Sequence, residues 1–267
     1  MKIAALQMVS GPDVDRNLAV AWRLMREAAQ GGAQLVGLPE YFCHMGRKDR
    51  DKLDVAEIAG DGPIQRMLGD AARELGLWVV GGTLPMRTDD PQRVRNANCV
   101  YAPDGTLAAR YDKIHLFRYD NGREQYDEGR AIEPGLEPRS VDAGGLRVGL
   151  SVCYDLRFPE LYRALSGNAP CDLICVPSAF THTTGQAHWE TLLRARAIEN
   201  QCYVMAPAQG GTHDNGRRTW GHSMVVDPWG EVVAELPEGE GVVMADLDLA
   251  RIAALRRQLP ALEHRRL

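Results

Sequence analysis

The sequence predicts one layered α/β domain. Short apolar runs that are typical of buried strands alternate along the chain with segments of helical periodicity. Two hairpins with glycine-containing turns are inserted between these units, and no internal repeat or low-complexity linker divides the chain. We therefore expect residues 1–267 to form a single domain.

In the first half of the chain, strands are predicted from apolar runs and helices from apolar side chains at helical spacing. Gly31 and Gly32 end the first helix, and Pro-Asp-Gly at 103–105 marks a hairpin turn. The polar, turn-rich stretch 118–138 is expected to be a long functional or mobile loop. The predicted elements are strands at 2–9, 34–38 and 77–84, helices at 15–30 and 62–75, and a hairpin of 98–101 with 106–111.

The second half continues the alternation. A short helix is expected to start near Phe158, with Pro159 at its first position and Gly167 as a left-handed cap. Thr183 fits a capping box for a long helix that runs to residue 201, with Trp189, Leu192, Leu193 and Ile198 directed inward. The other predicted elements are strands at 146–152, 171–177, 202–207 and 222–227, a hairpin turn at 228–230, a strand at 241–247 that closes the sheet, and a helix at 248–258.

Composition excludes several classes of protein. The net charge of −5 provides no basic surface for nucleic acid or an anionic membrane. The N-terminus has no signal-peptide pattern, and no apolar window is long enough to span a bilayer. Six cysteines are scattered without C-x-x-C spacing, which predicts reduced thiols rather than disulfides or a zinc site. We expect a cytoplasmic protein that uses no metal or cofactor.

Three polar residues each follow a predicted strand. Cys153 lies between an apolar run and a predicted helix, which is the strand–turn–helix arrangement that presents a nucleophile above a sheet. Glu40 and Lys113 could meet it at the same edge of the sheet. Each has a plainer interpretation as well: a cysteine after an apolar run is usually an inert buried side chain, and a glutamate is usually a solvated loop residue.

Together these residues suit acyl transfer. A thiol with an ordinary pKa of about 8.5 needs a base at neutral pH, and a nearby carboxylate can accept its proton and later deliver it to a leaving amine. The Lys113 ammonium and the backbone N–H of Tyr154 could stabilise the oxyanion of the tetrahedral intermediate.

Three ordered segments resemble the signature blocks of the nitrilase superfamily of carbon–nitrogen hydrolases. They are Leu-Pro-Glu-Tyr at 38–41, Tyr-Asp-Lys-Ile-His-Leu-Phe at 111–117 and Cys-Tyr-Asp-Leu-Arg-Phe-Pro-Glu-Leu at 153–161. The resemblance runs from residue 2 to the C-terminus. It implies a catalytic triad of Glu40, Lys113 and Cys153, a four-layer αββα sandwich, and a homodimer or higher homo-oligomer.

The superfamily has a second glutamate that helps to hold the lysine and the substrate. It lies in a block of the form aromatic-x-Glu-small, and Tyr-Asp-Glu-Gly at 126–129 fits this block. The resemblance therefore implies that Glu128, rather than Glu124, has this role. Gly129 stands where the family usually has serine.

Later segments are similar to the branch of the superfamily that contains deaminated glutathione amidase. These segments are 177–180, 187–190, 194–204, 221–230 and 257–266. The implied substrate is a small amide with a carboxylate at each end. Arg157 is a candidate for one carboxylate, although a solvated or ion-paired arginine is the plain alternative. Segments 181–184 and 213–218 are candidates for the other end, and the remaining oxyanion or substrate candidates are Tyr154, Ala179, Phe180 and His182.

Other functions stay open at this point. The first alternative is an ω-amidase for small 2-oxo-acid amides, or another carbon–nitrogen hydrolase such as a carbamoyl-amide hydrolase. A true nitrilase, a catalytically silent binding scaffold and a papain-like thiol hydrolase are further alternatives. The scaffold does not require Glu40, Lys113 and Cys153 together, and the papain-like enzyme requires a histidine base. No motif links a histidine to Cys153, although His182 and His188 could still lie in the pocket.

Overall fold

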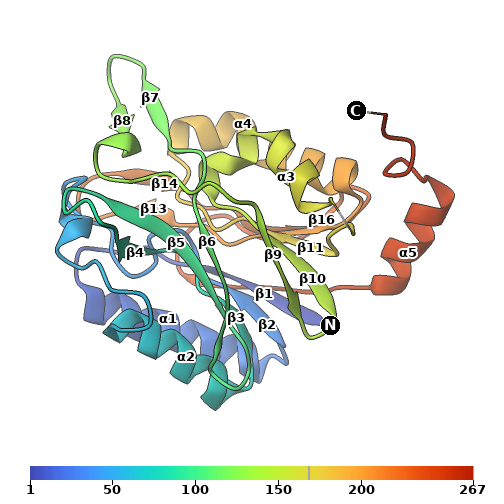
Figure 1. The fold of residues 1–267 in the computed structure, drawn as a ribbon, viewed down its shortest axis with the longest axis horizontal. Helices are drawn as coiled ribbons and strands as arrows, with labels where there is room; N and C mark the ends of the chain where they lie inside the picture. Colours follow the sequence, from blue (N-terminus) through green and yellow to red (C-terminus); the bar gives the residue numbers. More distant parts are fainter. Residues whose placement is uncertain (168, 267) are drawn as a thin grey trace.

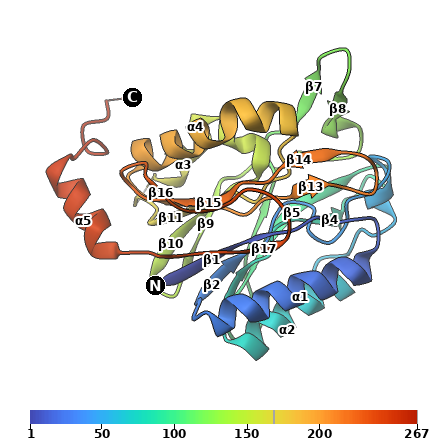
Figure 2. The same cartoon turned by 180° about the vertical axis from the view of Figure 1, so that it is seen from behind.

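Two β-sheets lie face to face between two pairs of helices (Figure 1). A computed structural model describes residues 1–167 and 169–266. Helices α1 (Val14–Gln30) and α2 (Pro63–Leu75) cover the outer face of one sheet, and α3 (Pro159–Leu165) and α4 (His182–Asn200) cover the other. This is the expected four-layer αββα sandwich. Helix α5 (Leu249–Gln258) lies beyond the end of the sandwich (Figure 2).

Each sheet mixes parallel strands with antiparallel edges. The first has the order β17-β1-β2-β3-β5-β4, with β6 beside β5, and the second has the order β16-β15-β12-β11-β10-β9. The first sheet contains β1 (Lys2–Gln7), β2 (Leu35–Gly37), β3 (Trp78–Val80), β4 (Leu84–Arg87), β5 (Val94–Tyr101), β6 (Leu107–Asp112) and β17 (Gly241–Asp246). The second contains β9 (Arg139–Ala143), β10 (Leu146–Leu150), β11 (Leu173–Cys175), β12 (Tyr203–Ala206), β15 (Ser223–Val226) and β16 (Val232–Leu236).

Strand β1 shows how the layers are held together. Its side chains alternate between two faces, as they must in an extended strand. Ile3 and Ala5 belong to the hydrophobic core shared with the second sheet, whereas Ala4 and Leu6 belong to the core shared with α1 and α2. Both faces are therefore buried, which explains why this strand reads as a continuous apolar run.

Local signals fix the ends of several elements as predicted. The Asp13 side chain accepts a hydrogen bond of 3.0 Å from the Arg16 N–H and caps α1. Pro63 occupies the first turn of α2, and Gly76 ends this helix at φ = 65°. Gly105 has φ = 85° in the turn of the β5–β6 hairpin.

Some boundaries differ from the predictions. The strand expected at 77–84 is two strands, because Gly82 turns the chain at φ = 57° where a Cβ would lie 2.2 Å from the Pro39 carbonyl oxygen. Helix α4 is capped by Thr181 rather than Thr183, and its Ile198 is 51% exposed rather than inward. Ser166 at φ = −87° caps α3, so Gly167 is not its left-handed cap.

Strand β17 pairs with β1 at the edge of the first sheet, so the strand predicted at 241–247 closes a sheet as expected. Two small hairpins lay outside the sequence predictions. The predicted loop contains a short hairpin, β7 (Arg118–Asp120) with β8 (Gln125–Asp127), that projects from the sandwich (Figure 1). A second small ribbon pairs β13 (Gly210–Thr212) with β14 (Arg218–Trp220). Among the described residues, no helix combines the length and apolar character needed to cross a membrane.

Candidate active site

The site forms where strands of both sheets end. Glu40 follows β2, Lys113 directly follows β6, and Cys153 follows β10 at the start of a short 3-10 helix, η3 (Cys153–Arg157). Cys153 has φ = 49° and Tyr41, next to Glu40, has φ = 57°. Non-glycine residues rarely adopt such angles, and they are concentrated at functional sites. The chain therefore turns sharply at two of the three predicted positions.

Lys113 lies between two carboxylates in the interior. Its side chain has no exposed surface, and its Nζ is 2.8 Å from Glu40 Oε1 and 2.9 Å from Glu128 Oε2. Burial by itself lowers the pKa of this lysine, but Glu128 and Glu40 outweigh that effect and raise the pKa above its ordinary value. Lys113 is thus a buried ammonium held in one position.

Hydrogen bonds to both carboxylate oxygens fix the orientation of Glu40. Oε1 accepts the hydrogen bond from Lys113 and a second one of 2.9 Å from Asn96 Nδ2. Oε2 accepts a hydrogen bond of 3.0 Å from the backbone N–H of Ala179. Ala179, predicted as an oxyanion or substrate contact, therefore positions the carboxylate here. Its N–H already donates to Glu40, whereas an oxyanion donor needs a free N–H.

The structure brings Glu128, and not Glu124, to the lysine. Glu128 Oε1 accepts a hydrogen bond of 2.7 Å from the Tyr41 hydroxyl, and Oε2 accepts one of 2.7 Å from the Phe117 N–H. Burial raises the pKa of Glu128, but Lys113 outweighs this and keeps the pKa below its ordinary value. Glu124 instead accepts a hydrogen bond from the Thr183 hydroxyl at 2.9 Å.

Cys153 is 7% exposed and lines a narrow pocket together with Glu40 and Glu128. Burial and the charge of Glu40 raise the pKa of its thiol well above the ordinary value, while Lys113 and the Ala179 N–H act in the opposite direction. Together these effects favour the protonated form of Cys153. It needs a base to become a nucleophile, and Glu40 is the neighbouring carboxylate.

Asp155 holds the turn that presents the thiol. It is fully buried, and its carboxylate accepts hydrogen bonds from the Val152 N–H at 2.8 Å, the Tyr111 hydroxyl at 2.7 Å and the His115 N–H at 3.0 Å. His115 Nδ1 also lies 2.7 Å from Asp155 Oδ1. A buried carboxylate requires such donors, and here they come from the segments that carry Lys113 and Cys153.

The remaining side chains of the narrow pocket are mostly aromatic or cationic. Arg157 lies over the rings of Tyr154 and Phe180, at 5.7 and 5.3 Å from their centroids, and its Nη1 is 3.2 Å from His188 Nδ1. His182 is not among the residues that line this pocket, and its ring packs edge-on against Trp220 with 5.0 Å between the centroids; its role as a substrate contact stays a prediction.

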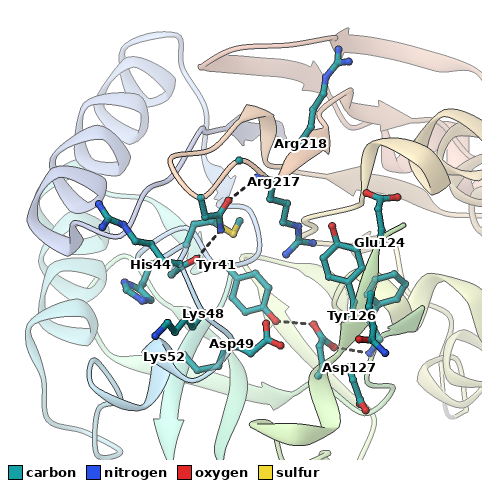
Figure 3. Close-up of a pocket in the computed structure, with 18 of the residues that line it drawn as sticks. Tyr41, His44, Lys48, Asp49, Lys52, Glu124, Tyr126, Asp127, Arg217 and Arg218 are labelled. Carbon is teal, nitrogen blue, oxygen red and sulfur yellow. Dashed lines mark hydrogen bonds between the residues drawn. The ribbon is translucent and has the colours of Figure 1, made fainter. Parts of the chain in front are cut away.

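A larger cavity of about 500 Å³ opens beside the narrow pocket (Figure 3). It is lined by the loop after Tyr41, by the β7–β8 hairpin and by the segment before β14. Phe117, Glu128 and Arg217 line both spaces, so the two adjoin at these residues. Within the described residues, no cluster of three or more His, Cys, Asp or Glu side chains is placed to hold a metal ion.

A family model described as carbon-nitrogen hydrolase matches residues 2–257. The chain belongs to this family. Proteins named deaminated glutathione amidase from Homo sapiens and Yersinia enterocolitica are 44% and 39% identical to it. These matches cover 99% of this chain in both cases, and 82% and 92% of the relatives.

Solved structures of this hydrolase family have the same fold. The Caenorhabditis elegans NitFhit protein is 40% identical with a TM-score of 0.92, over 99% of this chain, which spans 65% of that longer chain. An amidase from Nesterenkonia sp. AN1 is 28% identical with a TM-score of 0.80, over 98% of this chain and 99% of that one. In that structure acrylamide has added to the active-site cysteine.

Several residues of this hydrolase site carried no signal of their own in the sequence. Asn96 lies in β5, just before the predicted hairpin strand at 98–101, and Tyr41 belonged to the block at 38–41 without a role of its own. Lys52 lies in a charged loop that resembled solvated surface, yet its ammonium lies 5.2 Å from the centroid of the Tyr41 ring. Only tertiary contacts show that these side chains belong to the site.

Proposed function

We propose that this hydrolase cleaves the amide of deaminated glutathione, and that Glu40, Lys113 and Cys153 carry the reaction. The observation that supports this most directly is the buried Lys113 ammonium between Glu40 and Glu128, at the side of a pocket that the Cys153 thiol lines. A base, a cation and a nucleophile are the groups that amide cleavage through a thioester requires.

In acylation, Cys153 gives its proton to Glu40 and its sulfur attacks the carbonyl carbon. Lys113 stabilises the oxyanion that develops on the former carbonyl oxygen, with the Tyr154 backbone as a second candidate donor. The C–N bond then breaks as Glu40 returns the proton to the leaving nitrogen, and cysteinylglycine departs as a neutral amine. A thioester remains on Cys153.

In deacylation the same groups act in reverse order. Glu40 takes a proton from a water molecule, whose oxygen attacks the thioester carbon. The C–S bond breaks, the thiol regains the proton and 2-oxoglutarate leaves. Glu128 takes no proton in this scheme; it fixes Lys113 and keeps it charged throughout.

The substrate class is supported by the charges of the site and by the relatives. Deaminated glutathione is a 2-oxoglutaryl group joined by an amide to cysteinylglycine, and it carries a carboxylate at each end. Arg157 extends over the narrow pocket from the same turn as the nucleophile, where it can bind the carboxylate of the acyl group. The relatives from human and Yersinia enterocolitica carry the name of this activity.

The test compares two substrates. The enzyme should hydrolyse deaminated glutathione with a higher kcat/KM than 2-oxoglutaramate, which has the same acyl group but no dipeptide. Released cysteinylglycine or ammonia gives the rate. A clear preference for 2-oxoglutaramate would assign the chain to the ω-amidases, and inactivity on both would overturn the proposed substrate.

A further inference from the structure

Each of the two adjoining cavities suits a different part of an amide substrate, the acyl group or the leaving amine. Cys153 lines the narrow pocket but not the larger cavity, and the two spaces meet at Phe117, Glu128 and Arg217. During catalysis the acyl group is bonded to the sulfur, so it belongs on the narrow side. The amine side of the scissile bond then extends into the larger cavity, which opens to solvent and lets the first product leave.

The larger cavity carries more positive than negative side chains. Six cations line it against four carboxylates, and most of these carboxylates have partners already. Glu128 is paired with Lys113, Asp127 lies 3.5 Å from Arg130, and Glu124 accepts the Thr183 hydroxyl hydrogen bond. The lining cations are Arg47, Lys48, Lys52, Arg123, Arg217 and Arg218.

Lys52 and Arg217 are the two cations that extend over aromatic rings of this cavity. Lys52 Nζ lies 5.2 Å from the Tyr41 ring centroid, and the Arg217 guanidinium lies 5.1 Å from that of Tyr126. Figure 3 shows the guanidinium projecting toward these two rings, with Lys52 and Tyr126 on opposite sides of the space. Within residues 1–167 and 169–266, neither cation forms an ion pair with a carboxylate.

Arg217 is also incompletely bonded. Its Nη2 donates to the Ala179 carbonyl at 2.7 Å, but its buried Nε has no hydrogen-bond partner among the described residues. Burial lowers the pKa of Lys52, the negative charges of Glu128 and Asp49 oppose this effect, and the positive charges of Lys113 and Arg217 add to it. An anion bound between the two cations would satisfy the Arg217 Nε–H and stabilise both positive charges.

We propose that Lys52 and Arg217 bind the terminal carboxylate of the departing dipeptide, so that the larger cavity selects amides whose leaving amine ends in a carboxylate. This inference rests on the proposed function and adds a leaving-group subsite to it. An extended dipeptide reaches about 7 Å, so its far end lies well outside the narrow pocket. Arg217 lines both spaces, whereas Lys52 lines the larger cavity and not the narrow pocket, so we place the end of the leaving group beside Lys52.

The experiment uses two dipeptide substrates that differ in one group. Deaminated glutathione is compared with its analogue in which the glycine carboxylate is a primary amide, and the ratio of their kcat/KM values is measured. Wild-type enzyme should favour the carboxylate by about tenfold or more, the usual effect of a charge-assisted hydrogen bond. The difference should lie mainly in KM, because this contact is made equally in the ground and transition states.

Variants then assign the preference to a residue. In Lys52→Met the ratio should fall toward one, whatever happens to the absolute rates. Arg218→Gln is the matched control, since Arg218 borders the same cavity but pairs with Glu238 at 2.7 Å and points away from the space in Figure 3. This control should keep the wild-type ratio.

The outcomes separate the inference from the proposed function. If wild-type enzyme hydrolyses both dipeptide substrates equally well, the substrate stands and the subsite is wrong. If Lys52→Met keeps the full preference, or if Arg218→Gln loses it equally, the assignment to Lys52 is wrong. If wild-type enzyme cleaves 2-oxoglutaramate and neither dipeptide substrate, the proposed function fails and the subsite fails with it.

Discussion

The hydroxyl of Tyr111 donates a hydrogen bond of 2.7 Å to Asp155 Oδ2 in the interior of the protein. Tyr111 lies two residues before Lys113, at the end of a strand of the first sheet. Asp155 lies two residues after Cys153, beyond a strand of the second sheet. This one bond therefore crosses between the sheets and fixes the ammonium relative to the thiol.

Lys113→Arg is expected to be nearly inactive. The lysine ammonium is a compact charge between two carboxylates, and the planar, larger guanidinium cannot occupy the same position. Loss of an oxyanion donor typically lowers kcat by about 10²–10³. Steady-state amide hydrolysis by the purified variant measures this, with circular dichroism to verify folding. A near-normal kcat would show that Lys113 is not the oxyanion donor.

Glu128→Gln and Glu124→Gln form a matched pair. The first removes a charge that is bound to Lys113 and should lower kcat strongly, because the buried lysine then loses one of its two carboxylate partners and is held less firmly in position. The second removes a charge that is bound only to hydroxyl groups at the rim of the cavity and should retain most activity. The opposite result would mean that Glu124 is the second glutamate.

Glu40→Gln should change two properties of the site in opposite directions. Hydrolysis should be lost, since glutamine cannot accept the thiol proton. Alkylation of Cys153 by iodoacetamide should become faster near neutral pH. The Glu40 charge raises the thiol pKa and Lys113 lowers it, so removing the carboxylate lets the pKa fall and the thiolate forms at lower pH.

Mass spectrometry of the Cys153 peptide measures this alkylation as a function of pH. The midpoint of the profile should move to lower pH in Glu40→Gln, whereas the exposed, remote Glu190→Gln should leave it in place. An unchanged midpoint in Glu40→Gln would show that the two side chains do not interact electrostatically. Slower alkylation would show that Glu40 activates the thiol toward iodoacetamide as well.

The layers and the three central residues could be predicted, whereas much of the surrounding site could not. Buried strands such as β10 are predicted by their apolar runs. The turn at Cys153 is predicted because the apolar run ends there and Pro159 starts the next helix. The β7–β8 hairpin has three-residue strands without an apolar pattern, so it looked like a loop. Lys52 and Asn96 gain their roles only from tertiary contacts, Asn96 with Glu40 across 56 positions and Lys52 with the Tyr41 ring, which no sequence pattern indicates.

A covalent intermediate provides a direct check of the nucleophile. A slow amide substrate quenched in acid should leave its acyl group on Cys153, because the thioester forms before water can hydrolyse it. Intact-mass and peptide analysis locate the added mass. Cys153→Ala should show neither adduct nor hydrolysis, and wild-type rates in this variant would exclude the thioester mechanism.

Tyr111→Phe tests the bond that joins the two sheets. Both Tyr111 and Tyr162 are fully buried. Mutation to phenylalanine removes from Tyr111 its bond to the Asp155 carboxylate and a longer one of 3.3 Å that it accepts from the Ile114 N–H, and removes from Tyr162 one of 3.1 Å to the Ser151 hydroxyl. Tyr111→Phe should reduce the free energy of unfolding by about 1.5–3 kcal/mol and Tyr162→Phe by about 1 kcal/mol, because bonds to charged groups are stronger. Urea denaturation measures both losses.

The same two variants should differ more in catalysis than in stability. Of these two tyrosines, Tyr111 and not Tyr162 connects the strand next to Lys113 to the turn that carries Cys153. Tyr111→Phe, unlike Tyr162→Phe, should therefore lower kcat at saturating substrate while KM changes little. Assays well below the melting temperature separate this effect from unfolding. Equal kcat values in the two variants would mean that the remaining Asp155 contacts, from His115 and Val152, suffice to position the lysine and the thiol.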